Sequence, residues 1–338
     1  MKTVDLFCGC GGMSLGFQNA GFDIKLSVDS WDKAIQVYSA NFKHPVENID
    51  LTNEEETVKR LKEIKPEIIM GGPPCQDFSS AGKRDESLGR ADLTYHYANI
   101  VCAIKPEYFV MENVERIKKS GILLDIIKQF KNSGYGLTPV ILDASYCGVP
   151  QARTRFFLIG HRGGIDNALL PFLCEGLTEE KMTIRDYLGE SLNLTHYYRH
   201  PRNYSRRGVF SIDEPSPTVR GVNRPVPPGY KKHDGDSDQV DFSILRPLTT
   251  IERSYLQTFP KSFKFDGTKT NLEQMIGNAV PVNLATHLAK SIKKYSENKD
   301  IHSYALPLFE IPNTNLSRLL KTNKLSFSNQ IVDQRSLL

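Results

Sequence analysis

The fold is decided by the stretch Lys2-Thr3-Val4-Asp5-Leu6-Phe7-Cys8-Gly9-Cys10-Gly11-Gly12, in which an apolar run ends in a cluster of glycines. Helical spacing follows over residues 13–20. Glycines at a strand-to-helix turn let the backbone approach a ligand closely, and open α/β sheets bind ligands at the carboxyl ends of their strands. A tight structural turn explains the glycines equally well. Their spacing differs from the Gly-x-Gly-x-x-Gly of dinucleotide-binding proteins, which disfavours a nicotinamide dehydrogenase.

Strand and helix signals alternate through the first half of the chain. Apolar runs that suit strands are separated by segments with helical spacing of apolar residues. This alternation predicts a doubly wound α/β fold with a mixed, mostly parallel sheet. We expect strands at residues 2–7, 24–28, 67–70, 107–111, 137–143 and 155–160, and helices at residues 13–20, 31–42 and 121–132.

The pattern changes after about residue 163. Residues 195–235 are rich in Pro, Gly, Arg and Tyr, which predicts a smaller, loop-rich lobe. Helical periodicity returns near Thr249–Thr258 and in the segment that ends near Lys294. We therefore expect a catalytic and cofactor-binding domain at 1–165, the smaller lobe at 166–270, a return segment at 271–295 and an extension of unknown role at 296–338.

The bulk composition is that of a soluble globular protein, with 39% hydrophobic and 24% charged residues in a chain of 338. No run approaches the roughly 18 apolar residues that cross a bilayer. The first residues read as a strand rather than a signal peptide. We expect a cytoplasmic protein without membrane association.

Positive charge is concentrated in residues 199–232. This segment carries eight Lys and Arg residues against Asp213 and Glu214, a balance of +6 within a chain of net charge +4. Such a block is typical of a surface for a polyanion, and a solvated loop explains it equally well. The cationic residues are Arg199, Arg202, Arg206, Arg207, Arg220, Arg224, Lys231 and Lys232.

The six cysteines are scattered and do not have zinc-site spacing with nearby histidines. In a reducing compartment they are expected to be mostly free thiols, and no metal site is predicted. Cys75 stands out, because it follows Gly71-Gly72-Pro73-Pro74 just beyond an expected strand. Two prolines hold the following residue rigidly, and a thiol is a strong nucleophile once its pKa is lowered. The competing interpretation is a turn with a buried cysteine.

Charged residues also follow other expected strands. Glu112 ends an apolar strand, where desolvation would raise the pKa of its carboxyl group and favour a proton-donating form. Arg153 and Arg155 share a face if Arg155 begins a strand, and together they can hold a phosphate or a base carbonyl. Asp29 and Asp50 can bind a ribose and an adenine amino group. Taken alone, a local hydrogen bond explains Glu112 better, and simple exposure explains Asp29 and Asp50 better. Exposure at a strand edge explains the two arginines equally well.

Taken together and in order, these motifs resemble the DNA cytosine-5 methyltransferase family of the prokaryotic restriction-modification type, over roughly residues 1–290. One departure is Cys10, which stands where a small or apolar residue is usual. The resemblance rests on Asp5–Gly12, Pro73-Pro74-Cys75-Gln76, Glu112-Asn113-Val114, Gln151-Ala152-Arg153-Thr154-Arg155, Arg246-Pro247-Leu248-Thr249 and Gly277-Asn278-Ala279-Val280-Pro281.

The resemblance implies the fold of S-adenosylmethionine-dependent methyltransferases, with the smaller lobe recognising the DNA target. It implies that Cys75 adds to a flipped-out cytosine, that Glu112 is the acid, and that Arg153 and Arg155 support the pocket. The residues implied for S-adenosylmethionine are Phe7, Gly9, Gly11, Gly12, Asp29, Asp50, Pro74 and Asn278. Those implied for DNA are Gln76, Ser79, Arg202, Arg206, Arg207, Thr218, Arg220 and Arg224.

The expected partner is double-stranded DNA, methylated by a monomer that protects host DNA from an independently acting restriction endonuclease. Two alternatives stay open. An RNA (tRNA) cytosine-5 methyltransferase shares the Pro-Pro-Cys-Gln and Glu-Asn-Val motifs, although its second lobe is not expected to be so rich in arginine. A catalytically silent DNA-binding protein would not need Cys75, Glu112 and Arg155.

Overall fold

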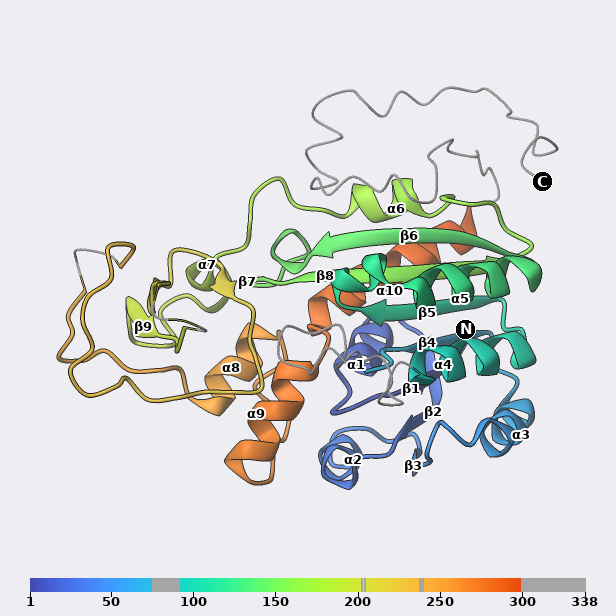
Figure 1. Cartoon of the computed structure of the whole chain (residues 1–338), viewed down its shortest axis with the longest axis horizontal. Coiled ribbons are helices and arrows are strands. Elements are labelled where there is room, and N and C mark those ends of the chain that lie inside the picture. The colour runs from blue at the N-terminus through green and yellow to red at the C-terminus, as the bar shows by residue number, and fades with distance from the viewer. Residues whose placement is uncertain (75–91, 202, 204, 237–239, 299–338) are drawn as a thin grey trace.

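The computed structural model describes residues 1–74, 92–201, 203, 205–236 and 240–298, which form a larger lobe and a smaller lobe (Figure 1). The larger lobe is built on a seven-stranded sheet in the order β3-β2-β1-β4-β5-β8-β6. Neighbouring strands from β3 to β5 are parallel, whereas β8 is antiparallel to both β5 and β6. The predicted mixed, mostly parallel sheet is therefore confirmed. Its strands are β1 Lys2–Leu6, β2 Asp23–Asp29, β3 Val46–Asn48, β4 Ile68–Gly71, β5 Tyr108–Asn113, β6 Tyr135–Asp143 and β8 Thr154–Arg162.

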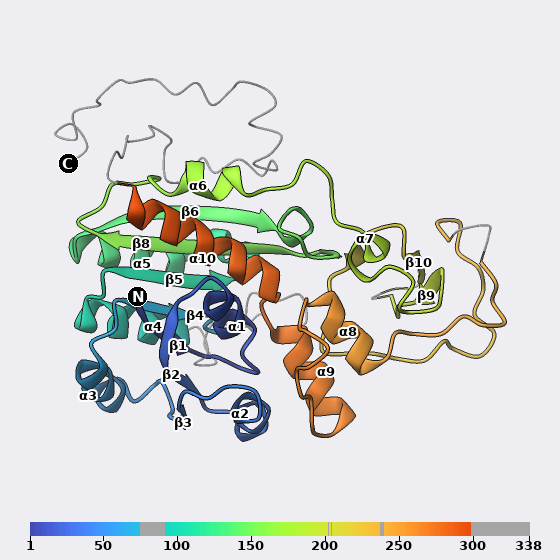
Figure 2. The same ribbon diagram turned by 180° about the vertical axis from the view of Figure 1, so that it is seen from behind.

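Helices cover both faces of this sheet. One face carries α1 (Gly12–Asn19), α6 (Leu170–Glu175) and α10 (Val282–Glu297) (Figure 2). The opposite face carries α3 (Glu54–Ile64), α4 (Asp92–Ile104) and α5 (Gly121–Asn132). Shorter elements complete the lobe: α2 Asp32–Ser39, η1 Glu115–Lys119 and η2 Ala144–Tyr146.

Alternation of side chains along the strands divides the core into two clusters. In β5, Tyr108 and Val110 face the side of α1 and α10, whereas Phe109 and Met111 face the side of α4 and α5. The same alternation places Glu112 on the side of α10.

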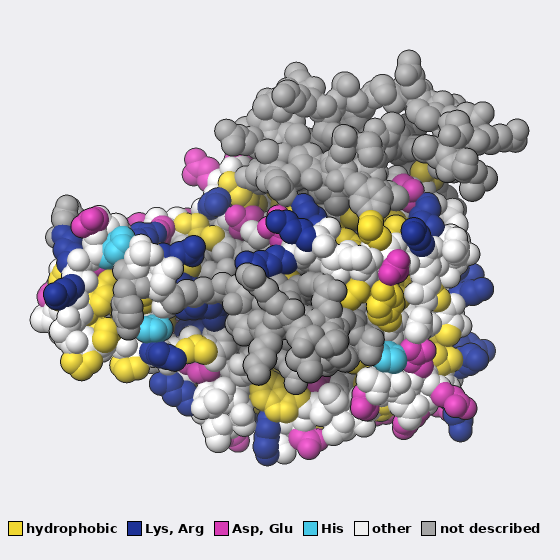
Figure 3. Space-filling model, viewed as in Figure 1, with side chains coloured by type: hydrophobic (Ala, Val, Ile, Leu, Met, Phe, Trp, Pro, Cys, Tyr) yellow, Lys and Arg dark blue, Asp and Glu magenta, His cyan; other side chains and the backbone are white. Residues whose placement is uncertain are grey.

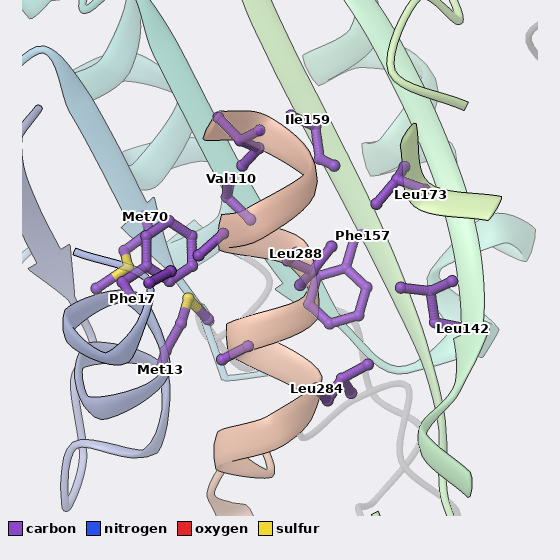
Figure 4. Close-up of a cluster of buried hydrophobic side chains, with 14 of the residues drawn as sticks. Met13, Phe17, Met70, Val110, Leu142, Phe157, Ile159, Leu173, Leu284 and Leu288 are labelled. Atoms are coloured by element: carbon purple, nitrogen blue, oxygen red, sulfur yellow. The ribbon is translucent and has the colours of Figure 1, made fainter. Parts of the chain in front are cut away.

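Helix α10 packs beside α1 on the same face of the sheet, although about 260 residues separate the two helices in the chain. Leu284 and Leu288 of α10 are fully buried and face Phe157 of β8 (Figure 4). Phe17 of α1 lies on the other side of the same helix (Figure 4). Burying each such side chain contributes about 1.5–3 kcal/mol, so the last described helix completes the first part of the fold.

The smaller lobe has little regular structure, as the sequence predicts. It is tied to the larger lobe by a short parallel pairing of β7 with β11, and its hydrophobic cluster includes Cys10 and Val282 of the larger lobe. This shared cluster fixes one lobe against the other. The strand β7 (Gln151–Ala152) belongs to the larger lobe, and the elements of the smaller lobe are α7 Ile184–Leu188, β9 His196–Tyr198, β10 Val209–Ser211, β11 Ser216–Pro217, α8 Thr250–Leu256 and α9 Lys269–Asn278.

Some predicted elements differ from the observed ones. The helix predicted over residues 31–42 is shorter, because α2 ends at Ser39 and Phe42 turns back to stack on Tyr38 with ring centroids 4.2 Å apart. The boundaries predicted for the domains stay predictions. Within the described ranges, Cys8, Cys10, Cys102, Cys147 and Cys174 are free thiols, and none of the helices combines the length and apolar character that a membrane span requires.

Candidate active site

A cleft of about 2160 Å³ lies between the two lobes. Its walls include the glycine turn after β1, the ends of β2, β4 and β5, and loops of the smaller lobe. Lys and Arg side chains gather on the smaller lobe in the face shown in Figure 3. The cleft thus lies at the carboxyl ends of parallel strands, where α/β folds bind ligands.

Each glycine of the turn has its own reason to be glycine. A Cβ on Gly11 would lie 2.3 Å from the Phe42 ring, and one on Gly12 would lie 2.3 Å from the carbonyl oxygen of Val280. Gly9, in contrast, has a φ of 54° and would meet no atom within 4 Å. Gly11 and Gly12 are therefore required by packing, whereas Gly9 leaves space free at the cleft wall. Phe7, with a φ of 60°, also lines the cleft.

Asp29 holds the glycine turn against the end of β2. Its Oδ2 accepts a hydrogen bond from the backbone N–H of Gly9 at 2.7 Å, and its Oδ1 accepts one from Trp31 at 2.8 Å. Each carboxylate oxygen keeps a second lone pair that can accept a hydrogen bond from a ligand. The residue thus shapes the site and also lines it.

Beyond Asp29 the cleft is flanked by apolar side chains that the sequence reasoning missed. Trp31, Ile49 and Leu51 all line it, and Ile49 and Leu51 are the chain neighbours of Asp50. Asp50 is exposed, and its pKa is lowered because its carboxylate accepts a hydrogen bond from the Thr52 backbone at 3.0 Å. A tryptophan two residues after a strand-end acid was the available signal, but it reads equally well as a core residue. The group is suited to a planar, amine-bearing ring.

A buried polar network lies behind the turn. Ser14 donates a hydrogen bond to the Asp5 carboxylate at 2.6 Å, and Tyr38 donates one to Ser14 at 2.7 Å. The Tyr38 hydroxyl also lies 2.6 Å from Nε2 of His44. Burial raises the pKa of Asp5 to about 7, although the hydrogen bond from Ser14 opposes the shift. Asp5 is therefore a carboxyl group that titrates near neutrality at the base of the site.

The segment after β4 is fixed against the end of β5. The side-chain amide of Asn113 donates a hydrogen bond to the carbonyl of Pro73 at 3.4 Å. A Cβ on Gly72 would lie 3.0 Å from Oε2 of Glu112, so glycine leaves room for that carboxyl group. Pro74 lines the cleft. Cys75, Gln76 and Ser79 lie outside the described residues.

Glu112 forms an ion pair with Arg155 of the neighbouring strand. The distance from Arg155 Nε to Glu112 Oε1 is 2.8 Å, and the side chains are only 14% and 13% exposed. Alternation along β8 puts Arg155 on the same face as Phe157, which is the partner of Glu112 across the strand pair. Burial raises the pKa of Glu112, and the positive charges of Arg155 and Arg153 limit the rise. The carboxyl group is thus protonated more readily than an exposed glutamate would be.

Arg153 joins three segments that are distant in the chain. Its side chain is buried and donates hydrogen bonds of 3.0 Å to the carbonyls of Val219 and Gly277. Gln151 also reaches the same loop, because its Oε1 accepts a hydrogen bond from the Val219 N–H at 2.8 Å. Arg153 therefore acts as a clamp between the lobes rather than as a group open to a phosphate.

Side chains of the basic block line the cleft in two ways. Arg207 pairs with Glu214 and lies over the Phe210 ring, 4.3 Å from its centroid. Arg206 and Arg224 are exposed at the cleft wall. Arg202 lies outside the described residues.

The last residue predicted for the cofactor, Asn278, closes α9. It lines the cleft and accepts a hydrogen bond at 3.0 Å from the side chain of Gln274. The segment that contains it returns to the glycine turn, because the carbonyl of Val280 lies against Gly12.

Comparison with known proteins gives matches along most of the chain. A family model described as C-5 cytosine-specific DNA methylase matches residues 1–294. Type II methyltransferase M.HindV of Haemophilus influenzae is 66% identical over 297 residues, which cover 88% of this chain and 98% of that protein. Type II methyltransferase M.HgiDI of Herpetosiphon aurantiacus is 57% identical over 295 residues, covering 87% and 95%. The solved structure of S. pombe Dnmt2 methyltransferase shares the fold, with a TM-score of 0.65, 20% identity and coverage of 88% and 99%.

Proposed function

This chain belongs to the C-5 cytosine-specific DNA methylase family, and from that premise we propose that its cleft holds S-adenosylmethionine and a flipped-out cytosine side by side. The reaction is methylation of carbon 5 of cytosine in DNA. The observation that carries the proposal is the Glu112–Arg155 pair, which lies beside the Pro73 segment in the wall of the same cleft as the glycine turn.

The residues around the glycine turn fit S-adenosylmethionine. Gly9 leaves open space where a ligand can approach the backbone, and the spare lone pairs of Asp29 can accept hydrogen bonds from ribose hydroxyls. Trp31 and Ile49 offer apolar surfaces for an adenine ring, with Asp50 as an acceptor for its amino group. When bound, S-adenosylmethionine supplies an electrophilic methyl group to carbon 5 of the cytosine. Phe7, Pro74 and Asn278 are proposed to complete this site.

The chain's own residues are proposed to make carbon 5 reactive. The thiolate of Cys75 adds to carbon 6 of the cytosine, and the ring electrons move toward carbon 5 and ring nitrogen 3. Glu112 holds a proton at ring nitrogen 3 and so stabilises the charge that enters the ring. Arg155 orients the Glu112 carboxyl group and can contact the base carbonyl, while Arg153 keeps the lobes in register. Loss of the carbon 5 proton and elimination of Cys75 restore the aromatic ring.

The basic wall of the smaller lobe is proposed to bind double-stranded DNA around the flipped cytosine. Base flipping costs a few kcal/mol, and contacts to the opened duplex offset that cost. Arg206 and Arg224 of this wall are exposed and line the cleft, so they can contact phosphates or guanines. Gln76, Ser79 and Arg202, which lie outside the described residues, are proposed DNA contacts on the sequence alone.

We further propose that the protein acts as a monomer in the cytoplasm and protects host DNA from a restriction endonuclease. The support is the likeness to two Type II methyltransferases. Bisulfite sequencing of DNA from a host that expresses the chain tests this role. Methylated cytosines confined to one sequence motif are expected, and scattered methylation would contradict it.

A test of the catalytic proposal measures the transfer of labelled methyl groups from S-adenosylmethionine to duplex DNA and to tRNA. We expect transfer to DNA by the natural chain, no transfer by Cys75→Ser, and near-normal transfer by the control Cys102→Ser. Duplex DNA that contains 5-fluorocytosine should trap the natural chain covalently and leave Cys75→Ser free. Preferential transfer to tRNA would favour the RNA alternative, and full turnover by Cys75→Ser would remove Cys75 from the mechanism.

A further inference from the structure

The loop from Thr218 to Arg224 follows β11 and forms part of the cleft wall. Its first residues are anchored to both lobes. Thr218 donates a hydrogen bond from its hydroxyl to the carbonyl of Ala152 at 3.0 Å, and its own carbonyl accepts one from Arg199 at 2.8 Å. The N–H of the next residue, Val219, donates a hydrogen bond to the side-chain oxygen of Gln151. The start of the loop therefore has a fixed position relative to the catalytic residues.

The later residues of the loop are held as firmly. The Arg220 side chain donates a hydrogen bond to the carbonyl of His200 at 2.5 Å, and the Arg220 carbonyl accepts one from Arg253. Asn223 donates a hydrogen bond to the carbonyl of Leu248 at 2.8 Å. Polar groups on both sides of the loop's centre thus form hydrogen bonds with other segments of the protein.

The backbone at the centre also has close neighbours. A Cβ on Gly277 would lie 2.4 Å from backbone atoms of Arg220 and Gly221. A Cβ on Gly221 would lie 2.4 Å from the side chain of Gln274. The loop is pressed onto α9 and has little room to move back when DNA enters.

Val222 occupies the centre of this anchored loop, and its side chain is 54% exposed at the cleft wall. A single exposed aliphatic residue on an open surface needs no explanation. Here, however, the side chain stands between anchored residues, beside the exposed Arg224, in a cleft that must receive DNA. Because Val222 is three positions after Val219, its Cα lies within roughly 11 Å of the loop position that Arg153 binds.

An aliphatic side chain contributes to base recognition through shape. It packs against a thymine methyl group or an unstacked base face, and it offers no hydrogen bond to other base edges. Valine has a single side-chain torsion and is stiff, so a rigid loop can place it with little loss of entropy. These properties suit a residue that distinguishes bases next to the reacting one.

We propose that Val222 is a specificity-determining residue, which packs against a base that flanks the flipped cytosine and so selects the flanking sequence. This inference rests on the proposed binding of DNA in the cleft. Arg220, rather than Val222, was expected from the sequence to contact DNA. The Arg220 side chain, however, donates a hydrogen bond to the carbonyl of His200.

The test uses duplexes in which the positions around the methylated cytosine are randomised, with methylation read by bisulfite sequencing. Val222→Ala and Val222→Asn are expected to change the preference at one or more flanking positions by about fivefold or more, the lower end of what one base contact contributes. Cofactor affinity and melting temperature are expected to stay unchanged. The control is Ile244→Ala, which removes an aliphatic side chain that is 70% exposed in the same lobe but does not line the cleft.

A flanking preference identical to that of the natural chain in both variants would overturn the proposal. If a variant is inactive on every sequence, competition binding among the same duplexes measures its selectivity without turnover, and an unchanged order of affinities would again overturn it. Failure of the proposed function is distinguishable, because the natural chain would then methylate no cytosine in the library.

Discussion

The Nε atom of Arg155 lies 2.8 Å from Oε1 of Glu112, and this ion pair joins two antiparallel strands at the wall of the cleft. The pair has competing effects on the carboxyl group. Burial favours the protonated form, whereas the guanidinium favours the carboxylate. The chemistry proposed for Glu112 depends on this balance.

Replacing Glu112 with Gln is expected to lower kcat by about 10²-fold or more, because an amide cannot carry the shared proton to ring nitrogen 3. Cofactor affinity, measured by calorimetry, should change little. Glu115→Gln is the matched control, since Glu115 lines the same cleft on η1. A near-natural rate for Glu112→Gln would exclude this role.

Replacing Arg155 with Met is expected to move the alkaline limb of the kcat–pH profile to higher pH. The guanidinium lowers the pKa of Glu112, so its removal leaves burial unopposed at that contact and raises the pKa. If the protonated carboxyl group is the active form, activity is lost as pH rises through the pKa, and a higher pKa delays that loss. The maximal rate should also fall, because the carboxyl group loses its orientation. An alkaline limb that does not move would show that Glu112 does not control it.

Asp5→Asn is expected to change how stability depends on pH. The pKa of Asp5 is raised in the folded protein to about 7, from an unfolded value near 3.8. Between these values the folded state binds more protons than the unfolded state, so Asp5 makes stability fall as pH rises through this window. Melting temperatures from pH 5 to 8 should therefore fall more steeply for the natural chain than for Asp5→Asn. Asp234→Asn, a change at an exposed residue, should leave the dependence of melting temperature on pH as it is in the natural chain. The same dependence in all three proteins would contradict the assignment of the raised pKa to Asp5.

Two glycine substitutions should separate packing from ligand binding. Gly12→Ala forces a methyl group against the Val280 carbonyl and is expected to destabilise the fold by about 1–3 kcal/mol. Gly9→Ala meets open space, so its cost is backbone strain on the order of 1–2 kcal/mol, but its methyl group enters the proposed cofactor site. Denaturant unfolding should thus show the Gly12 variant destabilised by packing, and calorimetry should show the Gly9 variant impaired in binding S-adenosylmethionine. Normal cofactor affinity in Gly9→Ala would argue against a ligand at this turn.

Arg153→Met is expected to destabilise the protein by about 2–5 kcal/mol, because the carbonyls of Val219 and Gly277 each lose a hydrogen bond in a buried place. Arg116→Met, a change of an exposed arginine that lines the same cleft, should have an effect below about 0.5 kcal/mol. Equal stability of the two variants in urea would show that Arg153 does not clamp the lobes.

The sequence alone predicts the sheet, apart from the short edge strand β3, and the helices α1, α5 and α10 that pack on it, because apolar periodicity reflects burial directly. It does not predict α3, α4 and α6, which cover the same sheet. The helix α5 begins and ends at the predicted residues, 121 and 132. Motif residues such as Glu112 and Arg155 were also recognisable, since strand ends in this fold converge on one edge of the sheet.

Contacts between segments distant in the chain were not predictable. Nothing in the local sequence distinguishes Arg220 or Thr218, which engage backbone carbonyls, from Arg224, which is exposed. Val222 likewise reads as an ordinary loop residue until the surrounding anchors are seen. These distinctions depend on contacts between segments that are distant in the chain. The spacing of residues along the sequence carries no information about such contacts.

The position of α10 has a consequence for biosynthesis. The apolar side of α1 leaves the ribosome well before α10, the helix that covers it, has been made. At about 5–20 residues per second, the roughly 260 residues between them take on the order of 10–50 seconds to translate. The nascent chain must keep Phe17 and its neighbours soluble during that time. Methylation competence therefore begins only after translation has passed α10, and a ribosome that stalls earlier releases a fragment with an unfinished core.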